Sequence, residues 1–117
     1  MCIRDRCGAC TVIMDGRTVN SCLVLAHEAE GCEVQTIEDL AKEGKLHPIQ
    51  EAFLEHGAIQ CGFCTSGMIM STKGLLEKNP NPGEDEIRSE MRGNICRCTG
   101  YVKIVEAIEA VRDGGDK

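Results

Sequence analysis

Tryptophan is absent from this chain of 117 residues, which has only one Tyr and two Phe. Aromatic side chains bury a large area each, so the apolar core of the chain must be thin. A chain of this length forms one domain or two very small ones, and small domains often depend on metals or crosslinks to stay folded. The composition therefore directs attention to residues that could bind a metal.

A basic surface is also lacking, because 13 Lys and Arg stand against 19 Asp and Glu, for a net charge of −6. Nucleic-acid binding needs clustered cationic side chains that neutralise phosphates, so we expect no nucleic-acid partner. The sequence has no run of about 18 apolar residues that could span a membrane. Met1 is followed by Cys2 and a charged stretch rather than by an export signal. We expect a cytoplasmic protein with no membrane span.

The usual patterns of a catalytic site are missing as well. No glycine-rich phosphate loop is present, and no Ser, His and Asp stand in a nucleophilic arrangement. His27, His47 and His56 are scattered, and we expect capping or surface roles for His47 and His56. The chain alone is therefore expected to contain no catalytic residue.

Cysteine, in contrast, is abundant: the chain has nine. Eight of them form two quartets, namely Cys2, Cys7, Cys10 and Cys22, and then Cys61, Cys64, Cys96 and Cys98. The first quartet begins C-x4-C-x2-C, the plant-type ferredoxin spacing, and a [2Fe–2S] cluster takes four thiolates. The second quartet reads C-x2-C, a long gap and C-x-C. Two such quartets predict two clusters and the passage of electrons between them.

Three other interpretations of the cysteines compete with this one. A disulfide framework fits poorly with an odd cysteine count and no export signal. A structural zinc site ordinarily uses two C-x2-C pairs, and C-x-C is atypical. A thioredoxin-like redox pair at Cys61 and Cys64 would leave Cys96 and Cys98 unexplained. Cys32 lies outside both quartets and is expected to be a small buried or half-buried residue.

The first part of the chain has the pattern of strands. We expect strands at residues 11–14 and 17–20 joined by a turn at Asp15-Gly16, because this dipeptide is a strong hairpin signal. A further strand at 33–36 and a short helix at 37–41 should follow. The polar stretch 42–45 is expected to be a linker.

From Leu46 the apolar spacing becomes helical and predicts four short helices. The first starts at Pro48 and ends near Gly57, the second is capped by Thr65 or Ser66, the third begins around 84–86 and the fourth begins at Tyr101. The C-x2-C pair and the C-x-C pair then fall in two turns that can meet at one end of a bundle. Helix starts after Cys64 and Cys98 would direct unpaired N–H groups toward an anionic cluster.

Several motifs occur together in order: Cys7-Gly8-Ala9-Cys10, Ser21-Cys22-Leu23, Gln60-Cys61-Gly62-Phe63-Cys64-Thr65 and Gly93-Asn94-Ile95-Cys96-Arg97-Cys98-Thr99-Gly100-Tyr101. Over about residues 7–111 the chain resembles the small iron–sulfur subunit of the molybdenum hydroxylases, the xanthine dehydrogenase and aldehyde oxidoreductase family. The resemblance implies an α+β fold. An N-terminally truncated β-grasp (plant-ferredoxin-like) domain would occupy residues 1–42, and a [2Fe–2S]-binding four-helix domain residues 46–113.

The resemblance also implies a function. The chain would be the electron-transfer subunit of an oxidoreductase whose molybdopterin is carried by a large partner subunit. Electrons would pass from there to the helical-domain cluster, then to the ferredoxin-like cluster, and then to FAD on a medium subunit or to another acceptor. By position, Gln60 and Cys98 match the family's residues that approach the pterin. The alternative from another class is a freestanding ferredoxin-like carrier.

The N-terminus departs from the family pattern. Glycines ordinarily separate the first two ligands, whereas this chain has Ile3-Arg4-Asp5-Arg6 between Cys2 and Cys7. Side chains there would crowd a cluster that needs close backbone approach. We therefore expect residues 1–6 to be a foreign or misassembled start joined to a genuine fragment. The Cys61 site should then be complete, and the Cys2 site should lack much of its domain.

Overall fold

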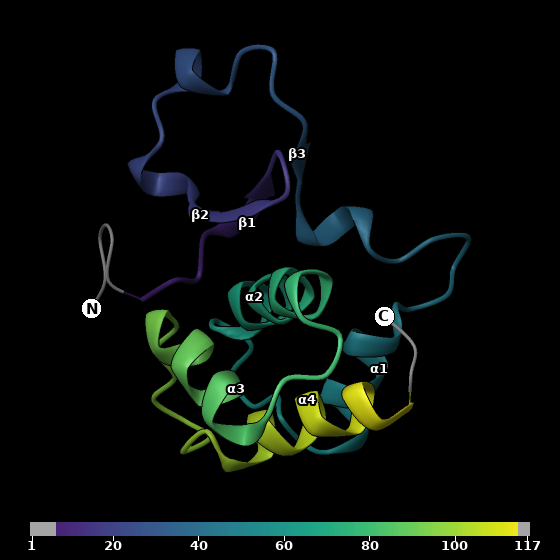
Figure 1. The fold of residues 1–117 in the computed structure, drawn as a ribbon. Coiled ribbons are helices and arrows are strands. Elements are labelled where there is room, and N and C mark those ends of the chain that lie inside the picture. The colour runs from purple at the N-terminus through teal and green to yellow at the C-terminus, as the bar shows by residue number, and fades with distance from the viewer. Residues whose placement is uncertain (1–6, 115–117) are drawn as a thin grey trace.

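The computed structural model describes residues 7–114, so Cys2 and the expected foreign start lie outside the described residues. The fold is α+β, with a small antiparallel sheet stacked on four helices (Figure 1). The α2 helix lies between the sheet and the other three helices. The predicted combination of strands first and helices second is confirmed.

The sheet has three strands in the order β2-β1-β3. Strands β1 (Thr11–Met14) and β2 (Arg17–Asn20) form the predicted hairpin, and Asp15 and Gly16 both take the positive φ that its tight turn needs. Strand β3 (Val34–Gln35) is shorter than the expected 33–36. At its start the Glu33 carbonyl still accepts from the Asp15 N–H at 2.8 Å, in the register of the β1–β3 pairing, but the Glu33 N–H donates to the side-chain Oδ1 of Asp15 at 2.9 Å.

Short 3-10 segments connect these elements, at Ser21–Leu23, Ala26–Ala29, Ile37–Asp39 and Met91–Gly93. The helix expected at 37–41 is the third of them and is therefore only a single turn. The expected linker closes on itself, because Lys42 and Lys45 exchange two backbone hydrogen bonds of 3.0 and 2.9 Å.

The four helices are α1 (Pro48–Glu55), α2 (Thr65–Lys78), α3 (Glu84–Glu90) and α4 (Val102–Gly114). All four were predicted, with differences at their ends. Helix α4 begins one residue later than expected because Tyr101 has φ +75°, which no right-handed helix accommodates. The predicted caps of α2 are wrong, because Cys64 is the residue that precedes the helix and the Ser66 hydroxyl donates to the carbonyl of Ala9 at 3.2 Å.

One hydrophobic core runs through both parts of the molecule. It joins Ile13 of β1 and Leu40 to the helices, where its most deeply buried side chains include Phe53, Met68, Met70, Ile104 and Ile108. The division of the chain into domains at 1–42 and 46–113 stays a prediction. Within residues 7–114, none of the helices is long and apolar enough to cross a membrane.

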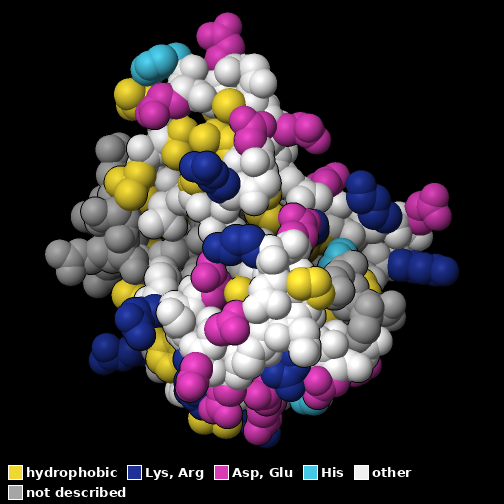
Figure 2. Space-filling view, viewed as in Figure 1, with side chains coloured by type: hydrophobic (Ala, Val, Ile, Leu, Met, Phe, Trp, Pro, Cys, Tyr) yellow, Lys and Arg dark blue, Asp and Glu magenta, His cyan; other side chains and the backbone are white. Residues whose placement is uncertain are grey.

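The surface in Figure 2 is mixed in character. Acidic side chains gather at the lower end of the view, and hydrophobic side chains gather in the upper part, over the strand region. Leu23 and Leu25 are exposed in that region, and Glu84, Asp85 and Glu86 begin α3. Negative side chains in a first helical turn interact favourably with the helix dipole.

Candidate functional site

The four cysteines of the second quartet come together from two distant turns. Cys61 and Cys64 lie between α1 and α2, and Cys96 and Cys98 lie between the Met91–Gly93 segment and α4. The thiols contact each other in two pairs, since Cys64 donates a hydrogen bond to Cys96 and Cys98 donates one to Cys61. Cys64 and Cys96 are both 8% exposed, whereas Cys61 and Cys98 lie at the surface.

These environments give the two buried thiols, Cys64 and Cys96, different pKa values. Burial, together with the hydrogen bond to Cys96, raises the pKa of the Cys64 thiol to about 12. Burial also raises the pKa of Cys96, but hydrogen bonds from the hydroxyl of Thr99 at 3.0 Å and from its amide at 3.4 Å outweigh it and lower that pKa. Because metals bind thiolates, a metal at this site would have to displace the proton of Cys64.

The turn that carries Cys96 is held by its own side chains. The Cys96 N–H donates to the hydroxyl oxygen of Tyr101 at 2.9 Å, and the Tyr101 N–H donates to Oγ1 of Thr99 at 3.2 Å. Sequence reasoning placed Tyr101 at the start of the last helix and gave Thr99 no role of its own. A half-buried tyrosine ordinarily finds a partner for its hydroxyl, which was the available signal.

The first quartet is gathered by the β1–β2 hairpin. Antiparallel pairing sets Thr11 opposite Asn20, so Cys10 and Cys22 come close together just beyond the two paired strand ends. Burial raises the pKa of the Cys10 thiol, but hydrogen bonds from Cys22 and Ser21 lower it by more, so that its pKa falls below the ordinary value. Cys7 is half-buried at the start of the same loop, and Cys2 is outside the described residues.

The loops of the two quartets touch each other. The Ile95 N–H donates to the carbonyl of Cys7 at 2.8 Å, and the Asn94 side chain donates from Nδ2 to the carbonyl of Gly8 at 3.0 Å. Gly8 takes φ +74°, and a Cβ there would lie 2.5 Å from the carbonyl oxygen of Gly93. Sequence reasoning missed Asn94, because an Asn beside a Gly is typical of any turn.

The thiols of the second quartet are of the ligand type that an iron–sulfur cluster takes. Within residues 7–114 they lie as two pairs, and no three His, Cys, Asp or Glu side chains converge on one point. Four thiolates in two pairs match a centre with two irons. Beside Cys64, the buried Oγ1 of Thr65 is left without a hydrogen-bond partner among the described residues, and this hydroxyl could donate to a sulfide.

Large apolar side chains are exposed close in sequence to the second quartet. Phe63 is 65% exposed, Ile95 50% and Val102 54%, and all three lie within four residues of a cysteine of the second quartet. Arg97 is exposed, and so is Gln60, which precedes Cys61. Exposed apolar side chains of this kind are typical of a surface that another protein covers.

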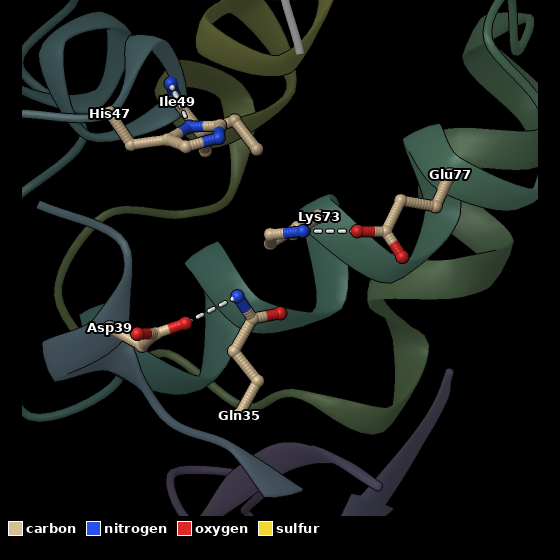
Figure 3. A network of polar contacts seen from close by, with 6 residues as sticks. All are labelled: Gln35, Asp39, His47, Ile49, Lys73 and Glu77. Atoms are coloured by element: carbon tan, nitrogen blue, oxygen red, sulfur yellow. Dashed lines mark hydrogen bonds and ion pairs between the residues drawn. The ribbon is translucent and has the colours of Figure 1, made fainter. Parts of the chain in front are cut away.

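Outside both quartets, Cys32 and His47 have structural surroundings. Cys32 is half-buried, as predicted, and its thiol donates to the carbonyl of Glu28 at 3.5 Å. His47 caps α1, because its Nδ1 accepts from the Ile49 N–H at 3.2 Å (Figure 3). The expectation that His47 caps a helix is thus confirmed.

Figure 3 also places the ammonium of Lys73 between His47 and the Gln35–Asp39 pair. Lys73 forms an ion pair with Glu77, and Gln35 donates to Asp39 at 2.8 Å. Burial is the larger cause, and the positive charge of Lys73 the next, of a lowered pKa at His47. Lys73 is therefore a charged contact between α2 and the segments that connect the sheet to α1.

Comparison with known proteins identifies relatives across most of the chain. Residues 36–109 match the family described as the [2Fe-2S] binding domain. The nicotine 6-hydroxylase small subunit of Paenarthrobacter nicotinovorans is 53% identical over 107 residues, which cover 92% of this chain and 64% of that one. The xanthine dehydrogenase iron-sulfur-binding subunit of Escherichia coli O157:H7 is 50% identical over 112 residues, covering 92% and 69%.

A solved structure agrees with these matches. The crystal structure of quinoline 2-oxidoreductase from Pseudomonas putida 86 superposes with a TM-score of 0.92 and 46% sequence identity. The superposition covers 98% of this chain and 72% of that one. This chain spans just under two thirds of the length of the nicotine 6-hydroxylase small subunit.

Proposed function

Because the chain belongs to the [2Fe–2S]-binding small-subunit family of the molybdenum hydroxylases, we propose that it is an electron-transfer subunit that works within a larger oxidoreductase. The observation that carries the proposal is the meeting of Cys61 with Cys98 and of Cys64 with Cys96. A [2Fe–2S] cluster held there would accept and release one electron at a time.

We assign one cluster to Cys61, Cys64, Cys96 and Cys98, and a second to Cys2, Cys7, Cys10 and Cys22. Thr99 supports the first assignment, because its two hydrogen bonds stabilise the thiolate of Cys96 that a cluster requires. The contact between Cys10 and Cys22 supports the second. The strand region would then be the ferredoxin-like, β-grasp part of the chain.

The partner in this proposal is a large subunit that carries molybdopterin. Gln60 and Cys98 would approach the pterin, since both lie on the exposed side of the second quartet. Phe63, Ile95 and Val102 would be covered by that subunit, since exposed apolar groups around a site are typical of protein interfaces. FAD on a medium subunit, or another acceptor, would take the electrons from the ferredoxin-like cluster, and the cytoplasm would be the compartment.

The direct test is the iron and acid-labile sulfide content of the chain after anaerobic reconstitution. We expect about four irons if both quartets are occupied, and about two fewer when Cys64→Ser removes a ligand of the second quartet. The matched control is Cys32→Ser, which alters a half-buried cysteine outside both quartets and should leave the iron content unchanged. Equal iron in the wild type and Cys64→Ser, or zinc in place of iron, would contradict the proposal.

Co-expression with a molybdopterin-binding subunit separates this function from that of a freestanding carrier. An obligate subunit should elute with the large subunit as one complex, and Phe63→Gln should weaken that complex without loss of iron. A chain that elutes as a monomer in the presence of the large subunit would support the freestanding carrier instead.

A further inference from the structure

The two ligand loops are fastened to each other by one buried side chain. We propose that Asn94 is a positioning residue that locks the Cys7–Cys10 loop onto the Cys96–Cys98 loop and thereby fixes the separation of the two metal sites. This inference rests on the proposed function, since it takes both loops to be ligand loops. It adds to that function a contact that keeps the two metal sites at a fixed separation.

The amide of Asn94 uses its acceptor and its donor on two different parts of the fold. Its Oδ1 accepts from the hydroxyl of Ser71, in α2, at 2.7 Å, and its Nδ2 donates to the carbonyl of Gly8 at 3.0 Å. The side chain is only 4% exposed, so water cannot easily replace either bond. Asn94 therefore ties the first ligand loop to the helix that follows Cys64.

A backbone hydrogen bond runs beside this amide. The Ile95 N–H donates to the carbonyl of Cys7 at 2.8 Å, and Ile95 is bonded directly to Cys96. Cys7 and Cys96 are thus joined through their backbones by a single hydrogen bond. Asn94 is the neighbour that holds both ends of that bond in place.

The packing at Gly8 leaves little freedom for the loops to move. A Cβ on Gly8 would lie 2.6 Å from Nδ2 of Asn94, and a Cβ on Gly67 would lie 2.0 Å from the carbonyl oxygen of Gly8. That oxygen also accepts from the N–H and the hydroxyl of Thr11, at 3.1 and 2.6 Å. Only a small, neutral donor such as a side-chain amide fits this position, because a carboxylate would oppose the carbonyl.

The rate of electron transfer between two centres falls steeply with the distance between them. A residue that fixes this distance therefore also affects the rate. One electron leaves one site, which is oxidised, and reaches the other, which is reduced, while no bond is made or broken. A looser contact between Cys7 and Ile95 would increase the distance between the two sites and so slow the transfer. Asn94 would therefore affect the exchange of electrons without binding a metal itself.

The test compares Asn94→Asp with the wild-type chain. Asn94→Asp keeps an acceptor for Ser71 but loses the donor to Gly8, whereas the control Ser71→Ala keeps the donor to Gly8. Amide hydrogen exchange at Ile95 and Thr11 should become about tenfold faster or more in Asn94→Asp, because the buried hydrogen bond to Gly8 is lost and the carboxylate opposes the Gly8 carbonyl. Exchange at Ile108 in α4 is the internal reference for global stability, and the two loop amides should stay near wild type in Ser71→Ala.

A second measurement uses the iron-loaded full chain, reduced by a photoexcited soluble flavin. At unchanged iron content, electron equilibration between the two centres should slow several-fold in Asn94→Asp, with a weaker magnetic interaction in the EPR spectrum. Unaltered equilibration, or loop amides whose exchange changes only as much as that of Ile108, would overturn the inference. A wild-type chain that binds no iron would refute the proposed function, and the amide-exchange experiment would still decide the role of Asn94.

Discussion

At the scale of single residues, polar side chains bond to the turns that carry the cysteines and to the helix ends. Thr99 and Tyr101 hold the turn after Cys96, and His47 holds the start of α1. Each of them satisfies a backbone or thiol group that the regular secondary structure leaves unpaired. Each such contact contributes little stability by itself. A short chain with few aromatic residues has a thin core, so it depends on these contacts more than a larger domain does.

His47 makes the stability of the chain depend on pH. Its Nδ1 can accept from the Ile49 N–H only when the imidazole is unprotonated there, and burial, then Lys73, lowers its pKa from the ordinary 6.5, opposed by Glu77. The folded state thus binds this proton less readily than the unfolded state. The stabilisation should be complete above pH 6.5 and be lost as the pH falls through the lower pKa of the folded state.

Urea unfolding between pH 8 and pH 5 measures this effect. His47→Asn keeps a capping side chain that does not titrate, so the pH dependence of the unfolding free energy should be shallower in this variant. His27→Asn, at an exposed histidine, is the matched control. If wild type and His47→Asn have the same pH dependence, the cap is not the titrating contact.

At the scale of elements, α2 is the helix on which the other parts are assembled. Its first turn follows Cys64, and its apolar side chains pack into the core. Gly74 faces the hairpin, and Gly67 faces the loop that precedes it. Gly67 and Gly74 allow the strand region to approach the helix closely. The helix gives up some intrinsic stability at both positions, because Gly is a poor helix former.

Gly67→Ala and Gly74→Ala should therefore differ although they change the same helix. A methyl group at Gly67 would lie 2.0 Å from the backbone oxygen of Gly8, whereas one at Gly74 would lie 2.5 Å from a methyl group of the Thr18 side chain, which can rotate away. Alanine favours the helix by about 1 kcal/mol at either site. We expect Gly67→Ala to destabilise the chain by about 2 kcal/mol, from overpacking against backbone, and Gly74→Ala to be nearly neutral.

Thermal unfolding of the two variants decides between these outcomes. Similar unfolding temperatures for Gly67→Ala and Gly74→Ala would mean that the first ligand loop can move away from α2. In that case the tight contact at Gly8 would not be needed for folding.

At the scale of the whole molecule, the proposed cluster joins segments that the chain connects only at long range. Cys64 precedes α2 and Cys96 lies beyond α3, so a metal bound to both would crosslink the helices. Ligands that bind only the folded state stabilise it by mass action. Cluster binding and folding should therefore be coupled.

The reconstituted chain should unfold at a higher temperature than the metal-free chain. A gain of about 3 kcal/mol corresponds to a rise of roughly 10–20 °C for a domain of this size. Calorimetry of both forms measures it, and Cys64→Ser is the control in which most of the rise should vanish. An equal unfolding temperature with and without bound iron would show that the fold does not depend on the metal.

Much of this architecture could be predicted from local sequence. The Asp15-Gly16 dipeptide fixes a hairpin because few residues tolerate positive φ, and the apolar spacing from Pro48 onward specifies four helices. The cysteine spacings indicate the metal because a cluster needs thiolates at limited distances. These patterns involve residues that lie close together in the sequence, so they can be recognised without the tertiary structure.

Other features were decided only by the tertiary structure. The contacts of Asn94, Thr99 and Tyr101 do not follow from their local sequence, because their partners are set by how the turns pack rather than by spacing. The same is true of Glu33, whose N–H bonds to the Asp15 side chain, and of Ser66, which contacts Ala9 instead of capping its helix. The sequence by itself thus determined the elements and the candidate ligands, whereas long-range packing decided which groups hold the ligand loops together.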